Sequence, residues 1–188
     1  PRIALPQAMP FIRIGSSSLA LCQADWITET LTKAAAGTDV PSWMAEDISK
    51  GVERFLTNHY RGTVIGSDEL FDRIEKTLSN LGLDDVAGNI DKTPPPVRIS
   101  LSELARRAGT GYELAFFGLL AEQLRSAASG GANRVECHGL RTCVKHLSAS
   151  KKWSRRCDQL QSEITQFVDS TSTLVTRARP EISMRIAS

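Results

Sequence analysis

Three consecutive prolines, Pro94, Pro95 and Pro96, constrain this chain more than any other feature of its sequence. A proline run cannot continue a helix and favours a stiff, extended connection. We therefore place a domain boundary here and predict two domains, residues 1–93 and residues 94–188. The length of 188 residues fits two small cores, since domains usually hold roughly 100 to 150 residues.

The net charge changes sign at the same boundary. Residues 1–93 hold 9 basic and 13 acidic side chains, a net charge of −4, whereas residues 94–188 hold 14 and 8, a net charge of +6. Halves of opposite charge either differ in role or attract each other. The apolar fraction of 41% and the charged fraction of 23% are typical of folded domains, which excludes a mainly disordered chain.

The sequence also indicates a compartment. No stretch approaches the roughly 18 uninterrupted apolar residues that a membrane span needs, and Pro1–Pro10 has no apolar segment of the kind found in secretory signals. The four cysteines are too few and too uneven for the disulfide framework of a small secreted domain; they are Cys22, Cys137, Cys143 and Cys157. We therefore expect a cytoplasmic protein with free thiols and no membrane partner.

Hydrophobic periodicity predicts a mainly α fold. Phe11–Ile14 and Leu19–Cys22 flank a polar turn and predict a small hairpin. Helical spacing predicts further elements at Ala24–Ala36, Pro41–Asn58, Ser67–Leu81, Asp84–Ile90, Tyr112–Leu124, Val135–Leu147 and Lys152–Val175, and Ser100 with Glu103 forms a capping box. The prediction is an N-terminal hairpin with three to four helices, followed by a helical bundle with a long C-terminal helix.

The last predicted helix has the most regular apolar pattern. Its seam runs in steps of four and three and consists of Trp153, Cys157, Leu160, Ile164, Phe167, Thr171 and Leu174. Such a seam needs a partner helix. Because it covers only about three heptads, we favour a partner within the chain, and a protein partner or self-association through the Trp153–Leu174 seam stays open.

The first half carries a family pattern. In the third predicted helix, Leu70–Leu78 reads L-F-D-R-I-E-K-T-L and is followed by Gly82 and then Val86-Ala87. With the hairpin and the order of the helices, residues 11 to about 90 resemble an ATP-cone, the nucleotide-sensing domain of ribonucleotide reductases and of the repressors that control them. The resemblance implies the cone's fold and ATP or dATP as the ligand.

The nucleotide-binding part of that pattern is altered. Where the family's first strand reads V-x-K-R-x-G, this chain has Phe11–Gly15, which keeps Arg13 and Gly15 but has Ile12 in place of the lysine. Trp26 stands where the family often has a second lysine. Phosphates are held by fixed positive charge, so one arginine is a weak substitute for a cluster. Arg13 and Gly15 are the candidate nucleotide-binding residues.

Cysteine and histidine gather in the second half, at Cys137, His138, Cys143, His146 and Cys157. Their spacing fits no common zinc module, and buried cysteines that act as small hydrophobes explain the pattern more simply. Cys143 and His146 could form a thiolate pair, but no orienting acid or oxyanion loop is recognisable. We therefore expect no metal site, no catalytic residue and no resident cofactor.

Two further segments of the second half suggest nucleic-acid contacts. Leu101–Gly109 looks like the first helix and turn of a helix-turn-helix, but Tyr112–Phe117 lacks the polar side chains of a recognition helix. The basic cluster Lys151, Lys152, Arg155 and Arg156 could bind phosphates or an acidic partner.

The leading hypothesis is a non-enzymatic regulatory or interaction module with a degenerate ATP-cone-like domain. Two alternatives stay open. One is a working ATP or dATP sensor, and the other is a nucleic-acid-binding regulator that uses the basic C-terminal half.

Overall fold

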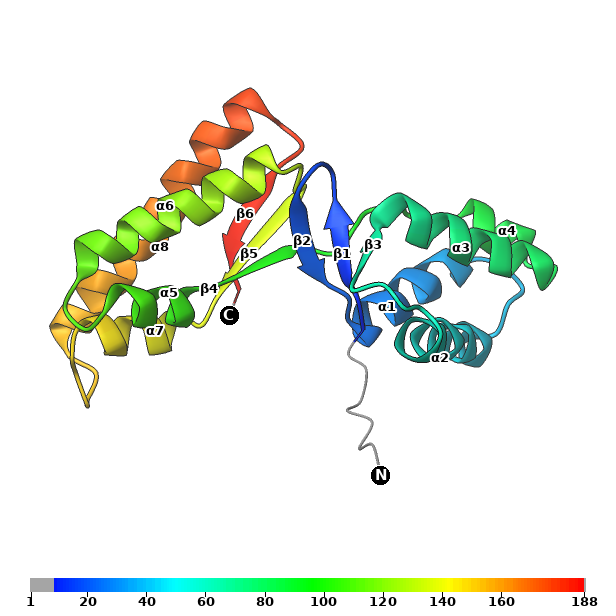
Figure 1. The fold of residues 1–188 in the computed structure, drawn as a ribbon, viewed down its shortest axis with the longest axis horizontal. Helices are drawn as coiled ribbons and strands as arrows, with labels where there is room; N and C mark the ends of the chain where they lie inside the picture. Colours follow the sequence, from blue (N-terminus) through cyan, green and yellow to red (C-terminus); the bar gives the residue numbers. More distant parts are fainter. Residues whose placement is uncertain (1–8, 188) are drawn as a thin grey trace. The chain divides into compact units, whose positions relative to one another are not determined.

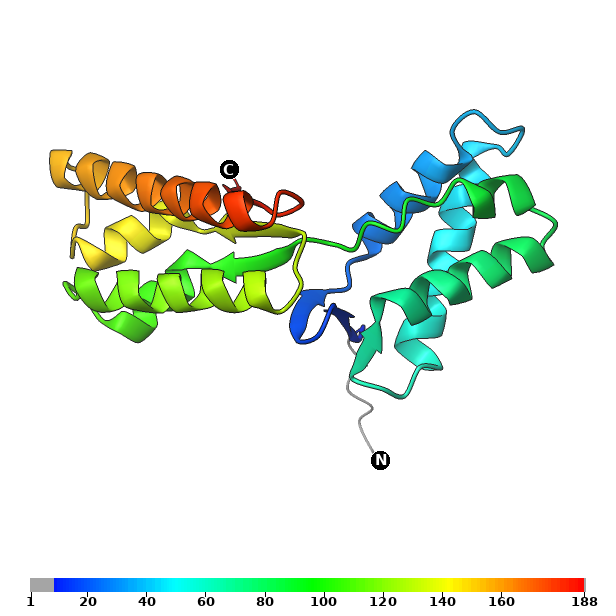
Figure 2. The same cartoon turned by 90° about the horizontal axis from the view of Figure 1, so that it is seen from above.

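The computed structural model describes residues 9–187 of the chain. This part divides into two compact units (Figures 1 and 2). The first unit holds the residues up to Ile14 together with Leu19–Pro95, and the second holds Gly15–Ser18 together with the residues from Pro96 onward. Helices make up 59% of the structure, so the predicted, mainly helical fold class is confirmed.

The first unit combines a three-stranded sheet with four helices. Its elements, in chain order, are β1 (Phe11–Ile14), β2 (Ser18–Leu21), α1 (Ala24–Ala35), α2 (Ser42–Asn58), β3 (Val64–Gly66), α3 (Ser67–Asn80) and α4 (Asp84–Gly88). The predicted hairpin is present as β1 and β2. Strand β3 was not predicted, and it pairs in parallel with β1 to give the order β2-β1-β3.

The core of the first unit follows from the amphipathic pattern of its elements. Helix α1 packs on α2 and on α4, and α3 packs on α4. The largest fully buried side chains of this unit come from both the sheet and the helices, and they are Ile12, Ile27, Leu31, Leu56, Ile65, Leu70, Phe71 and Leu78. Gly82 lies two residues beyond the end of α3. Its φ of +74° is a left-handed conformation that glycine adopts at little cost, and it ends the helix there.

The second unit alternates strands with pairs of helices. Its elements are β4 (Val97–Ser100), α5 (Leu101–Ala108), α6 (Glu113–Ser129), β5 (Arg134–His138), α7 (Leu140–Leu147), α8 (Arg155–Ala178) and β6 (Ser183–Ile186). The strands form an all-parallel sheet in the order β4-β5-β6. The long C-terminal helix is confirmed as α8, and Ser100 caps α5 by accepting a hydrogen bond from the Glu103 backbone N–H.

The sequence predicted a helical bundle here and did not predict this sheet. In the structure, the helices of the second unit pack on strands as well as on each other. The three strands have four or five residues each, too short to stand out against the longer helical pattern. Val135–Leu147 was predicted as one helix. In the structure, Gly139 with φ of +77° separates the end of β5 from the start of α7.

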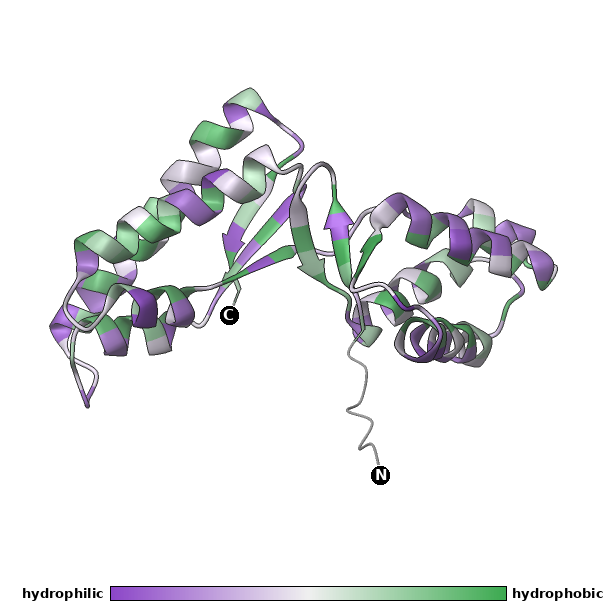
Figure 3. Cartoon of the chain, in the orientation of Figure 1, coloured by the Kyte–Doolittle hydropathy of each residue, from purple (hydrophilic) through white to green (hydrophobic). Residues whose placement is uncertain are grey.

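The β4–β5–β6 sheet has one apolar and one polar face, because side chains alternate along a strand. Val97, Ile99, Val135, Cys137 and Met184 share the apolar face and are buried. The residues between them are charged or polar, which gives the alternation of hydrophobic and hydrophilic residues visible along these strands in Figure 3. Parallel sheets usually have both faces covered by apolar packing, so this polar face is unusual.

Much of the predicted seam of α8 is buried within the second unit. Cys157, Leu160 and Ile164 are at most 2% exposed, and α8 packs on β6, α7 and α6. Phe167 is half-buried, with its ring 5.1 Å from that of Phe117. Leu174, at the end of the seam, is 65% exposed. The seam therefore has its main partners inside this chain.

Candidate functional site

The polar face of the β4–β5–β6 sheet concentrates positive charge. Its residues are Arg98 and Ser100 from β4, Arg134, Glu136 and His138 from β5, and Ser183 and Arg185 from β6. We call these seven residues the basic sheet face. Three arginines against one glutamate give it a net charge of +2 with the histidine neutral.

The register of the parallel strands arranges these residues in three rows. Arg98, Glu136 and Arg185 form the central row across β4, β5 and β6. Ser100 lies opposite His138 in the row toward the carboxyl ends of the strands, and Arg134 lies opposite Ser183 in the row toward the amino ends. Rows two residues apart are about 7 Å apart along the strands. The backbone thus fixes the spacing of the side chains.

Glu136 holds the central row together. Its side chain is only 8% exposed, and its Oε1 accepts hydrogen bonds from Nη2 of Arg185 at 2.5 Å and from Nε at 3.2 Å. Nε of Arg98 lies 3.8 Å from the other carboxylate oxygen. Burying a carboxylate costs free energy unless it is paired, so the ion pairs with these two arginines offset the cost of burying Glu136. Both remain substantially exposed, at 42% and 69%.

The basic sheet face was not predicted from the sequence. The sequence pattern that could have revealed it is the alternation of apolar and polar residues in Val97–Ser100, Arg134–His138 and Ser183–Ile186. Each run is four or five residues long, and nothing in the sequence shows that the three runs pair. Only the parallel register brings the three arginines to one surface.

The two candidate nucleotide-binding residues lie near the end of β1 and in the turn that follows it, Arg13 in the first unit and Gly15 in the second. Arg13 is exposed and stands opposite Gly66 of β3, where a Cβ would lie 4.0 Å from the Arg13 guanidinium. Arg13 therefore reaches the start of α3. Gly15 has a φ of +58°. Trp26, where the family resemblance expects a lysine, packs edge-on against Phe71 with ring centroids 5.9 Å apart.

The basic cluster of the sequence analysis lies before and at the start of α8. Lys151, Lys152 and Arg155 are exposed, whereas Arg156 donates a hydrogen bond of 2.6 Å to Glu113. The guanidinium of Arg141 lies 5.0 Å from the centre of the Trp153 ring, so a further cation borders the cluster. Arg156 is exposed as well, so all four predicted cations are presented to solvent, one of them paired with Glu113.

Cys22, Cys137 and Cys143 are packed as small apolar side chains, whereas the Sγ of Cys157 lies 3.4 Å from the hydroxyls of Ser148 and Ser154. These hydrogen bonds lower the pKa of Cys157 to about 7. All four are free, and within residues 9–187 no group of three or more histidine, cysteine or carboxylate side chains could hold a metal ion. Burial raises the pKa of Cys137 and of Cys143 to about 12, which disfavours a thiolate at neutral pH. His146 lies with Nε2 3.5 Å from the Thr110 hydroxyl. The arrangement gives Cys143 no activation as a nucleophile.

No protein-family model, curated protein or solved structure shows significant similarity to this chain. In the part of the chain that the structure describes, no helix has the length and apolar character to cross a membrane. Any functional assignment therefore has to come from the chain's own residues and their geometry.

The contribution of the Glu136 ion pairs to stability can be tested by replacing both arginines with uncharged side chains of similar length, which keep the carboxylate buried. The double variant Arg98→Met and Arg185→Met retains long side chains but leaves a buried carboxylate unpaired, and we expect the free energy of unfolding to fall by about 1–3 kcal/mol. Glu136→Gln leaves two solvated arginines and should cost about 1 kcal/mol or less. Urea unfolding at neutral pH measures both; a larger loss for Glu136→Gln would contradict this account.

The buried thiols predict a dependence of stability on alkaline pH. The folded-state pKa of Cys143 is raised from 9.0 to about 12, so its contribution to stability is complete below about pH 9 and is lost as pH rises toward 12. The wild-type protein should therefore lose more stability than Cys143→Ala between pH 8 and pH 11. Urea unfolding at both pH values measures this; equal losses would contradict the burial of the thiol.

Proposed function

We propose that this chain is a non-enzymatic regulatory module that binds single-stranded nucleic acid through the basic sheet face. One observation supports this above others. Arg98, Arg134 and Arg185 stand on neighbouring parallel strands of a sheet whose polar face is exposed, and a buried glutamate orients two of them. The net charge of +6 in residues 94–188 would attract such a ligand to this unit.

Phosphate is the chemistry that these side chains fit best. A guanidinium presents five N–H donors in a planar fork that matches phosphate oxygens. Arg185 uses Nε and one Nη2 hydrogen on Glu136, so the rest of its fork is free to donate outward. The hydroxyl of Ser183 and the imidazole of His138 add polar groups in the flanking rows, whereas the hydroxyl of Ser100 caps α5.

The shape of the face favours a single strand over a duplex. Major-groove recognition usually requires a helix or a β-ribbon that enters the groove, whereas this site is the surface of a short sheet. Strands of four or five residues extend about 15 Å, enough for a few nucleotides. The strand residues that form the face include no Phe, Tyr or Trp, so base stacking would contribute little and binding would be tolerant of sequence.

We expect the triple variant Arg98→Gln, Arg134→Gln and Arg185→Gln to bind a fluorescent 20-nucleotide single strand at least tenfold more weakly than the wild type. Each lost phosphate contact lowers the slope of log K against log salt by about 0.7, so the slope should fall by about 2. Fluorescence anisotropy between 50 and 200 mM salt, roughly the range where such contacts weaken strongly, measures both quantities.

The basic cluster supplies a matched control. Lys151→Gln, Lys152→Gln and Arg155→Gln together remove the same number of charges from exposed positions outside the sheet. The proposal expects the full-length cluster variant to retain most of its affinity and salt slope. If the cluster variant loses binding and the sheet variant keeps it, the basic sheet face is not the site.

A second candidate function, ATP or dATP sensing by the first unit, has a separate support. The residues that resemble an ATP-cone lie in a mixed three-stranded sheet with four helices, and Arg13 reaches the start of α3. The start of a helix favours negative charge, although Asp68 and Glu69 occupy that turn here.

For this second function, millimolar ATP or dATP should raise the melting temperature of the full chain, and Arg13→Ala should abolish the shift. Arg61→Ala, which removes an exposed arginine of the same unit outside β1, is the control. A melting temperature that stays constant with nucleotide would contradict nucleotide sensing and leave the sheet-face proposal untouched.

A further inference from the structure

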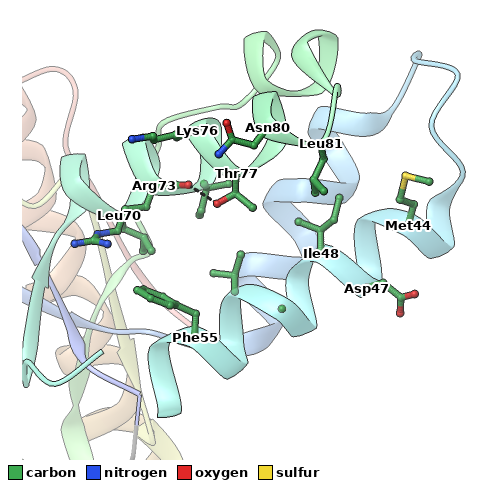
Figure 4. Close-up of a pocket in the computed structure, with 13 residues that line it drawn as sticks. Met44, Asp47, Ile48, Phe55, Leu70, Arg73, Lys76, Thr77, Asn80 and Leu81 are labelled. Atoms are coloured by element: carbon green, nitrogen blue, oxygen red, sulfur yellow. Dashed lines mark hydrogen bonds between the residues drawn. The ribbon is translucent and has the colours of Figure 1, made fainter. Parts of the chain in front are cut away.

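A groove separates α2 from α3 in the first unit (Figure 4). Its volume is about 630 Å³, within the range of about 300–1,000 Å³ that small-molecule sites occupy. Helix α2 packs on α1 and helix α3 packs on α4, so each wall is supported from behind. The groove separates the sides of α2 and α3 that face each other.

The walls of the groove are apolar stripes at helical spacing. They are formed by Met44, Ile48, Val52 and Phe55 on α2, by Leu70 and Ile74 on α3, and by Leu81 just beyond it. Phe55 is 38% exposed and Leu81 is 59% exposed. Met44, Ile48 and Val52 are half-buried, whereas Leu70 and Ile74 of α3 are buried. The exposed apolar surface of the groove therefore comes mainly from α2 and Leu81, and a contiguous exposed apolar surface marks a binding site.

The groove is elongated. Its α2 wall runs from Met44 to Phe55, and its α3 wall runs from Leu70 to Leu81. Eleven residue steps at 1.5 Å give each wall a length of about 17 Å. In Figure 4, Phe55 lies near Leu70 at one end, and Leu81 lies above Ile48 toward the other. A straight, narrow ligand fits this shape better than a compact one.

Charge differs between the two ends. The guanidinium of Arg73 lies 5.6 Å from the centre of the Phe55 ring, and Lys76 follows one turn later on α3. Arg73 donates to Glu69 through Nε and Nη2, which leaves its Nη1 donors available. Asp47 borders the groove one turn from Met44 and is paired with Lys50 at 3.6 Å. A negative head group is therefore favoured at the Phe55 end.

We propose that this groove binds a single-chain anionic amphiphile of the fatty-carboxylate class. The carboxylate is held by Arg73 and Lys76, and the alkyl chain lies along the apolar walls toward Met44 and Leu81. Burial of the methylenes supplies most of the affinity, and the cations set the direction of binding. This site is independent of the basic sheet face and of nucleotide sensing.

Titration calorimetry with decanoate, at concentrations where it is monomeric, tests the proposal on the full chain. Gly51 lines the groove, and a Cβ built there meets nothing within 4 Å, so Gly51→Leu fills the groove without a clash. The proposal expects one decanoate per wild-type chain and at least tenfold weaker binding to Gly51→Leu. Gly118→Leu, at a helical glycine of α6 with equally free space, should bind like the wild type.

The head group is tested separately with a surface variant that leaves the groove open. Arg73→Gln should weaken decanoate binding about tenfold and leave the weaker binding of neutral decanamide unchanged. Lys50→Gln, at an exposed lysine of α2, should change neither. Absence of decanoate binding, binding that survives Gly51→Leu, or equal affinity for decanoate and decanamide would each overturn the proposal.

Discussion

The carboxylate of Glu136 is the group on which the proposed site of the second unit depends. It is buried in the central strand of a parallel sheet, and Arg98 and Arg185 on the two neighbouring strands are its partners. Pairing in register is what allows one residue to orient two guanidiniums from segments almost ninety positions apart in the chain. An arginine held in this way loses less conformational freedom when it binds phosphate, which favours a preorganised anion-binding face.

The two proposed sites lie in different units, and their surfaces fit ligands of different chemistry. The basic sheet face is polar and positive, so the ligand proposed for it carries negative charge along its length. The α2–α3 groove is apolar and elongated with cations near one end, so its ligand must bring apolar surface.

Helical periodicity predicted most of this fold, because α2, α3 and α8 are long enough for their apolar stripes to repeat several times. The apolar seam of α8 was predicted from the same periodicity, and the Ser100 cap was predicted from the capping-box motif that Ser100 forms with Glu103. Strands β1 and β2 were predicted because a local turn joins them, whereas the short strands β3, β4, β5 and β6 were missed because they pair in parallel with segments far away in the chain. The basic sheet face was not predicted for the same reason. Arg98, Arg134 and Arg185 are far apart in the sequence, and only strand pairing makes them neighbours. The cluster at residues 151–156 was easier to find because its charges are consecutive.

The most direct test of the central claim is residue-resolved NMR of the full chain during titration with a single-stranded 10-nucleotide oligomer. If the basic sheet face binds nucleic acid, the largest shift changes will lie in β4, β5 and β6, with the guanidinium signals of Arg98 and Arg185 among them. Changes confined to the 151–156 cluster and the start of α8, with the strands unaffected, would contradict the account.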